Sequence, residues 1–185
     1  MDLLFKNPSY FIKTYFSFSP IGFLVALTGF FIVMIFLSRK RFKSRIGKWV
    51  FIILSSFYLA TLIGMTLLSV SRIGTVVIHL NPLDNIYDLF DYDASVHQLR
   101  GCLSNIILFI PFGVFSSIFF KKHKVLYSLF SGFFVSLIIE ILQYVLHRGC
   151  AETMDVICNT IGALIGAVIT VLFMKLIYRK HQTKE

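Results

Sequence analysis

Two apolar runs and one polar stretch make up residues 125–174, VLYSLFSGFFVSLIIEILQYVLHRGCAETMDVICNTIGALIGAVITVLFM. The apolar runs cover residues 125–146 and 156–174, and the stretch between them is HRGCAETMD, residues 147–155. An apolar run of about 20 residues is long enough for a helix to cross the hydrocarbon layer of a bilayer. The stretch therefore predicts two transmembrane helices joined by a polar turn.

Three further apolar runs precede this pair, at residues 20–38, 49–70 and 102–120. The chain has 185 residues, of which 57% are hydrophobic and 15% are charged, whereas about 25% are charged in soluble domains. A chain of this size cannot bury so much apolar surface in a soluble core, so lipid is its natural solvent. We predict an all-α, polytopic transmembrane helical bundle of about five spans.

Basic residues cluster in three segments, at residues 39–48, 121–124 and 175–185, which hold thirteen of the eighteen lysines and arginines. With five spans, these segments lie on one side of the bilayer. Because lysine and arginine accumulate on the cytoplasmic side of membranes, that side is predicted to be the cytoplasm. The protein is then a multi-pass protein of the cell membrane, with its N-terminus outside and its C-terminus inside.

Five regions follow one another along the chain. They are an interfacial aromatic segment at 1–19, two scaffold helices at 20–70, an extracytoplasmic loop at 71–101, a three-helix core at 102–174 and a basic cytoplasmic tail at 175–185. The scaffold spans contain no ionisable residue. Within the loop, Asn81-Pro82 interrupts an apolar stretch, which leaves a re-entrant arrangement open beside the simpler surface loop.

The net charge of +9 does not indicate nucleic-acid binding. The basic residues lie in short runs between apolar segments, which is where orientation signals belong. Three cysteines, Cys102, Cys150 and Cys158, cannot all pair with one another. The sequence does not decide whether two of them are bridged, and three thiols are the simpler expectation.

Polar side chains inside the predicted spans gather toward the outer leaflet. A carboxylate inside a bilayer costs about 2.5–3.5 kcal/mol on insertion scales, so Glu140 must face other helices or a wet cavity. Gln143 and His147 share its helical face, and Asp155 and Asn159 share a face of the next span. We predict one polar cluster that consists of Asn105, Glu140, Gln143, His147, Arg148, Glu152, Asp155 and Asn159.

Two interpretations of this cluster stay open. It is either a hydrogen-bonded network that docks spans three to five, or a polar pocket open to the outer face or to lipid head groups. No metal and no cofactor are predicted, because the spacing of His147 and the nearby acids matches no zinc pattern. Ser104 and Cys150 lie near the cluster, but nothing in the sequence marks either as an activated nucleophile.

Small and rigid residues occupy the same three spans. Pro111 and Gly113 are predicted to kink the third span. Gly162 and Gly166, at GxxxG spacing, are predicted to allow close packing of helices.

Three motifs in this half of the chain resemble the VanZ-like family of small membrane proteins. They are NIILFIPFG at residues 105–113, EILQ at residues 140–143 and RGCAETMDVICNTIGALIG at residues 148–166. The resemblance covers about residues 81–170, and LNPLDNI at residues 80–86 looks like a loose version of a further family segment, with Leu83 where phenylalanine is usual. Many members carry a second acid just before the position of Asp155, where this chain has Met154. The name-giving member is associated with resistance to teicoplanin, a glycopeptide antibiotic with a lipid tail. The resemblance thus implies a place in the cell envelope and supplies no mechanism.

The expected function is to bind or exclude an amphiphile through the outer-leaflet cluster. The amphiphile would be a lipoglycopeptide such as teicoplanin or a lipid-linked envelope precursor, and membrane lipid is the expected partner. The alternative is a membrane-embedded enzyme that acts on a lipid head group, with Glu140 as general acid or base. A transporter is disfavoured because the cytoplasmic halves of spans three to five carry few ionisable groups. The sequence leaves the oligomeric state open.

Overall fold

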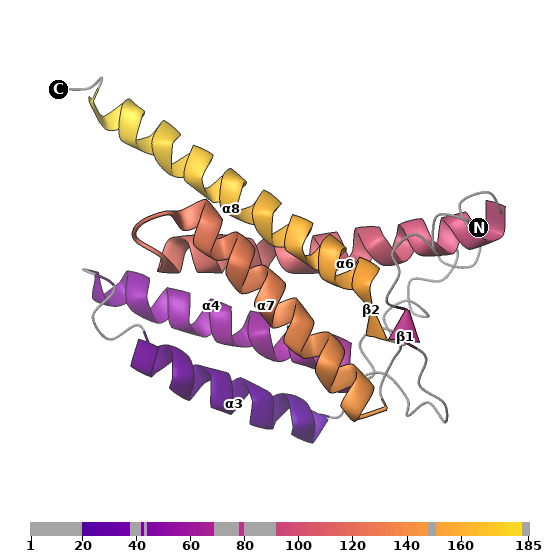
Figure 1. Cartoon of the computed structure of the whole chain (residues 1–185). Coiled ribbons are helices and arrows are strands. Elements are labelled where there is room, and N and C mark those ends of the chain that lie inside the picture. Colours follow the sequence, from indigo (N-terminus) through magenta and orange to yellow (C-terminus); the bar gives the residue numbers. More distant parts are fainter. Residues whose placement is uncertain are drawn as a thin grey trace, which may run out of the picture. The chain divides into compact units, whose positions relative to one another are not determined.

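The computed structural model describes residues 20–37, 42, 44–68, 78–79, 92–147 and 151–182. These residues fall into two compact units. The first is Met1–Val76 with Leu142–Gly149, and the second is Val77–Ile141 with Cys150–Glu185. Figure 1 labels the elements, which in order are α3 (Pro20–Leu37), α4 (Arg45–Ile63), the π-helical turn η1 (Gly64–Leu68), β1 (Ile78–His79), α6 (Tyr92–Phe119), α7 (Lys124–Val145), β2 (Ala151–Glu152) and α8 (Thr153–Gln182).

Four of the described helices are long and apolar enough to cross a membrane. They cover Arg45–Leu68, Leu99–Phe119, Lys124–Val145 and Thr153–Ile177. A shorter apolar helix, Phe23–Ile35, lies within α3 at the place of the first predicted span. The prediction of a helical membrane bundle is confirmed, and the chain is a membrane protein.

In the first unit, α3 and α4 lie side by side (Figure 1). Their aromatic rings meet at both ends, with Phe23 near Phe57 at 5.9 Å and Phe31 near Trp49 at 6.4 Å between ring centroids. The residue number increases along α3 from Phe23 to Phe31, while that of the partner ring in α4 decreases from Phe57 to Trp49. The two helices therefore run antiparallel. Ser44 caps α4, because its hydroxyl accepts a hydrogen bond from the N–H of Gly47 at 3.2 Å.

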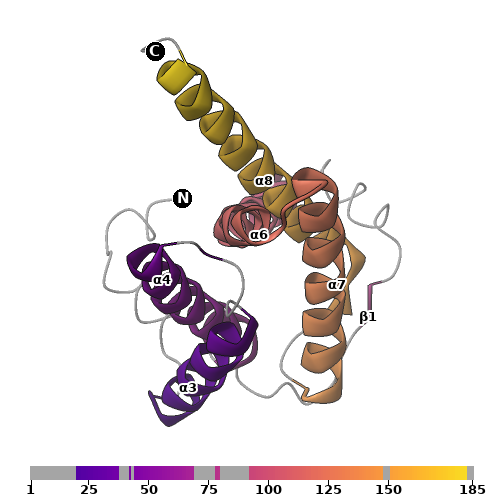
Figure 2. The same cartoon turned by 90° about the vertical axis from the view of Figure 1, so that its left-hand side faces the viewer.

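In the second unit, α6 and α8 form the main helix pair (Figures 1 and 2). Glycines bring their backbones together. A Cβ added at Gly162 would meet the carbonyl oxygen of Ile106, and one added at Gly166 would meet that of Ile110. The residue numbers of the contacting pair increase together in the two helices, so α6 and α8 run parallel. Only glycine fits where the two backbones touch.

Two helices extend beyond the apolar runs that predicted them. α6 begins at Tyr92 rather than near Cys102, and α8 ends at Gln182 rather than near Met174. The predicted loop 71–101 and tail 175–185 therefore each contain helix. Hydropathy detects only the part of a helix that is apolar, whereas backbone hydrogen bonding continues through polar residues.

A pair of two-residue strands was not predicted. β1 pairs in parallel with β2, with Ile78 opposite Ala151 and His79 opposite Glu152. This pairing brings a piece of the predicted loop beside the start of α8. The predictions for residues 1–19 and for Asn81-Pro82 lie outside the described residues.

The expectation of three thiols is wrong. Cys102 of α6 and Cys158 of α8 form a disulfide with a Cα–Cα distance of 5.5 Å. The two residues are 56 positions apart in the sequence. Only the parallel packing of α6 on α8 brings them together, which the cysteine count alone does not reveal. Cys150 lies outside the described residues.

Candidate polar site

One face of α7 carries the first part of the site. Its buried residues include Ser128, Gly132, Ser136 and Glu140, each four positions after the last. Residues four apart lie on one helical face, so Glu140 follows three small residues along the same face of α7. A Cβ added at Gly132 would lie 2.5 Å from the Cβ of Ala163 in α8, so this face lies close to α8.

Glu140 lies where α7 meets the start of α8. It is only 6% exposed, and its Oε2 accepts a hydrogen bond from the backbone N–H of Glu152 at 3.0 Å. Glu152 immediately precedes α8, where backbone N–H groups have no partner within the helix. A carboxylate here also interacts favourably with the positive end of the helix dipole. Glu140 thus ties α7 to the beginning of α8.

Three carboxyl groups converge at this position. Glu140, Glu152 and Asp155 are close enough to interact electrostatically. Within the described part of the chain, no lysine or arginine forms an ion pair with any of them. The described residues therefore supply no cationic partner to this group.

Two amide side chains complete the site. Asn105 of α6 forms a side-chain hydrogen bond with Asp155. Asn159, which is 4% exposed, donates from its Nδ2 to the hydroxyl of Ser136 at 2.8 Å. Its Oδ1 is buried and has no hydrogen-bond partner among the described residues. The site thus joins α6, α7 and α8 and leaves one acceptor unused among the described residues.

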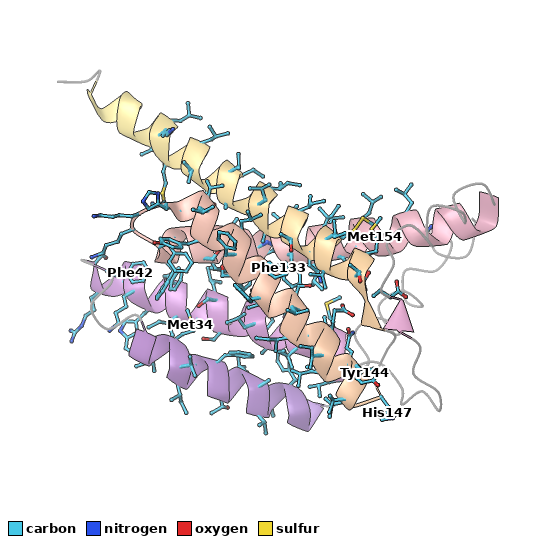
Figure 3. The ribbon with its side chains drawn as sticks, viewed as in Figure 1. Met34, Phe42, Phe133, Tyr144, His147 and Met154 are labelled. Atoms are coloured by element: carbon cyan, nitrogen blue, oxygen red, sulfur yellow. A yellow bond between two sulfur atoms is a disulfide. The ribbon has the colours of Figure 1, made fainter. Side chains whose placement is uncertain are left out.

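Two members of the predicted cluster belong to the first unit, and a third is not described. Gln143 donates from its Nε2 to the carbonyl of Thr66 in η1 at 3.0 Å. His147 is exposed just beyond the end of α7 (Figure 3), with a φ of 54° and its Nδ1 3.3 Å from the carbonyl of Val145. Arg148 lies outside the described residues. The structure brings together Asn105, Glu140, Glu152, Asp155 and Asn159 in the second unit.

The predicted packing residues lie along α6 and α8. Gly162 and Gly166 face the α6 backbone, and a Cβ at Gly113 would meet the carbonyl oxygen of Ala163. Pro111 lies inside α6, which continues as one helix to Phe119. Because proline has no N–H, one hydrogen bond to the preceding turn is missing there.

Sequence reasoning missed Ser136. Serine is common in membrane helices and often forms a hydrogen bond with the backbone of its own helix. Its presence at position 136 therefore did not indicate a contact with another helix. Its spacing from Glu140 and Gly132 was the available signal, because a run of small residues every fourth position marks a helix contact.

The arrangement can attract a positive charge and accept hydrogen bonds. Three carboxyl groups and an unused amide oxygen are all acceptors when the acids are ionised. Among the described residues, no group of three or more histidine, cysteine, aspartate or glutamate side chains is arranged to hold a metal ion.

Comparisons with known proteins cover the part of the chain that carries the motifs and extend further toward the N-terminus. A family model described as VanZ/LLP1 matches residues 55–174. Protein VanZ from Enterococcus faecium is 29% identical over 122 residues, which cover 61% of this chain and 68% of that protein. No solved structure matches the chain. The family match confirms the resemblance of the motifs, and it runs from within α4 through η1, α6 and α7 to Met174 in α8.

Proposed function

The chain belongs to the VanZ/LLP1 family, and from this premise we propose that it acts in the cell membrane by binding or excluding an amphiphile. The amphiphile is a lipoglycopeptide antibiotic such as teicoplanin or a lipid-linked envelope precursor. Its head group interacts with the carboxyl and amide groups of Asn105, Glu140, Glu152, Asp155 and Asn159 from the outer side of the membrane.

The burial of Glu140 among other acids carries this proposal. A carboxyl group that is 6% exposed is expensive to desolvate, and the neighbouring Glu152 and Asp155 add repulsion. A head group that carries a positive charge and hydrogen-bond donors would offset both the repulsion and the desolvation.

The chain's own charges favour this kind of ligand. A protonated amine matches the three acids, and an N–H or O–H donor matches the unused Oδ1 of Asn159. The apolar part of the amphiphile would remain in the lipid that surrounds the helices. This combination supports a membrane-bound amphiphile over a soluble polar ligand.

Drug susceptibility tests the proposal in cells that depend on this chain for resistance to a lipoglycopeptide. We expect Glu140→Gln and Asp155→Asn to return susceptibility toward that of cells without the protein, with membrane protein levels unchanged. The amide in Glu140→Gln still offers an oxygen to the N–H of Glu152, so it removes the charge and keeps the contact.

Ser131→Ala is the matched control, because Ser131 lies on α7 and, among the described residues, its hydroxyl bonds the local carbonyl of Ser128 at 3.1 Å and no other helix. It should leave susceptibility unchanged. If both acid variants retain full resistance at normal protein levels, the proposal fails. If purified protein instead converts a labelled envelope lipid, and Glu140→Gln abolishes that turnover, the site is catalytic and not a binding site.

A further inference from the structure

The disulfide lies in register with the glycine contacts between α6 and α8. Cys102 bonds Cys158, Ile106 meets Gly162, and Ile110 meets Gly166. Each pair is 56 positions apart in the sequence, and each follows the last by four residues. The disulfide therefore continues the same row of contacts between α6 and α8 by one more helical turn.

The two cysteines lie at a similar distance from the start of their apolar segments. Cys102 lies three residues after the start of the apolar segment Leu99–Phe119, and Cys158 lies five residues after the start of Thr153–Ile177. At 1.5 Å per residue, both lie within about 8 Å of the same end of the helix pair. Asp155 and Asn105 each lie three residues away from one of the cysteines, so the polar site is at this end too.

The opposite end of the same helices carries most of their basic residues, and Arg100 is an exception near Cys102. Lys121 and Lys122 follow α6, and Lys175 lies near the far end of the α8 apolar segment. Positive residues accumulate on the cytoplasmic side of membranes. Stable disulfides form in oxidising compartments and are rare in the cytosol. The two signals are chemically independent, and each assigns the disulfide end of the pair to the non-cytoplasmic side.

We propose that Cys102 and Cys158 are oxidised on the extracytoplasmic side of the membrane, so that Glu152 and Asp155 face outside the cytoplasm. This inference rests on α6 and α8 alone and does not depend on which ligand the site binds.

The chemistry needs an oxidant, which we assign to the class of oxidised dithiol proteins that work outside the cytoplasm. Cys102 is half-buried and Cys158 is 1% exposed, so Cys102 is the thiol that an oxidant reaches. Its thiolate attacks one sulfur of the oxidant's disulfide, forms a mixed disulfide and releases one thiolate. The Cys158 thiolate then attacks Cys102 Sγ and releases the second. The oxidant gains two electrons, and the two protons lost by the cysteines are taken up by its thiolates.

The first experiment measures the redox state in cells. The variant Cys150→Ser keeps only Cys102 and Cys158, and cells that express it are quenched in acid before lysis. Maleimide-linked polyethylene glycol is then added in denaturant, with or without prior reduction. We expect no mass shift before reduction and two adducts after it. Adding Cys158→Ser gives the control, with one adduct under both conditions. Two adducts without reduction would overturn the proposal.

The second experiment measures the side of the membrane. A single reporter thiol is added to the Cys150→Ser chain, either as Leu99→Cys at the disulfide end or as Lys122→Cys at the basic end. Both side chains are exposed on the protein surface, Leu99 at the first residue of the α6 apolar segment and Lys122 in the turn after α6. We expect a membrane-impermeant maleimide to label Leu99→Cys in intact cells and Lys122→Cys only after permeabilisation. Labelling of Lys122→Cys in intact cells, with Leu99→Cys labelled only after permeabilisation, would contradict the proposal, whatever the drug susceptibility experiment shows.

Discussion

The side chain of Glu140 provides both a hydrogen-bond acceptor and a carboxyl group close to other acids. Its Oε2 holds the N–H of Glu152 at the start of α8, and its charge adds to that of the neighbouring acids. These roles separate by substitution, because glutamine keeps the acceptor without the charge and alanine removes both. An unpaired buried N–H costs roughly 1–3 kcal/mol.

We therefore expect Glu140→Ala to lower the free energy of unfolding by about 1–3 kcal/mol, and Glu140→Gln to change it far less. The measurement is unfolding of purified protein in mixed micelles with rising denaturing detergent. Equal stability of the two variants would mean that the contact with Glu152 contributes nothing.

Ser136 and Asn159 form a buried contact between two helices of the second unit. Hydrogen bonds between side chains of membrane helices contribute about 0.6–2 kcal/mol. Ser136→Ala should lower stability by that amount and leave Asn159 with a second unpaired group. Ser131→Ala serves as the control, since its hydroxyl bonds only its own helix. A loss of the same size in both variants would indicate a general effect of removing serine from α7.

At the scale of elements, α6 and α8 are held by backbone contact. A Cβ at Gly162 would meet the carbonyl of Ile106, whereas nothing lies within 4 Å of a Cβ at Gly101 in α6. Gly162→Ala must push the helices apart, which costs about 1–3 kcal/mol. Gly101→Ala should be neutral or slightly stabilising, because alanine favours helix over glycine.

Thermal unfolding of the two glycine variants in detergent is the direct comparison. A lower midpoint for Gly162→Ala alone supports backbone contact at the α6–α8 stripe. Matching midpoints would show that the helices can separate without cost.

In the first unit, the end of α4 depends on a side chain from α7. The helix ends in the π-helical turn η1, where the last carbonyls have no partner further along the helix. Gln143 donates to the carbonyl of Thr66, which matters because an unpaired carbonyl in lipid is costly.

Gln143→Met keeps the length of the side chain and removes the donor. We expect it to lower stability by about 1 kcal/mol. Tyr144→Phe, at the next and exposed position, is the control and should change little. The two variants are compared by unfolding in mixed micelles, and a neutral Gln143→Met would leave the contact without a role in stability.

For the whole molecule, the disulfide closes a long loop that contains all of α7 and β2. Closing a loop of this length restricts the unfolded chain and contributes about 2–4 kcal/mol. Reductant should therefore lower the unfolding midpoint of the wild-type protein. It should have no effect on Cys158→Ser, which starts at the lower value. An equal response of both proteins to reductant would show that the bond does not stabilise the fold.

The apolar runs by themselves determined that this is a helical membrane protein. Runs of about 20 apolar residues have one stable solution in a bilayer, because only a helix satisfies its own backbone there. The VanZ-type motifs at residues 105–113, 140–143 and 148–166 predicted the family, which the family model confirms. Hydropathy placed the ends of the helices less accurately. The helix α6 starts at Tyr92, ten residues before the predicted start at Cys102, because polar residues continue a helix without adding hydropathy.

Tertiary structure decided which of the polar residues meet. Glu140 and Gln143 are three positions apart on α7, yet Glu140 bonds the start of α8 and Gln143 bonds η1. Spacing along one helix fixes only the direction in which a side chain leaves it. The neighbour it reaches depends on which helix packs there, and the parallel pairing of α6 with α8 that joins Cys102 to Cys158 follows from backbone contact at glycines far apart in the sequence.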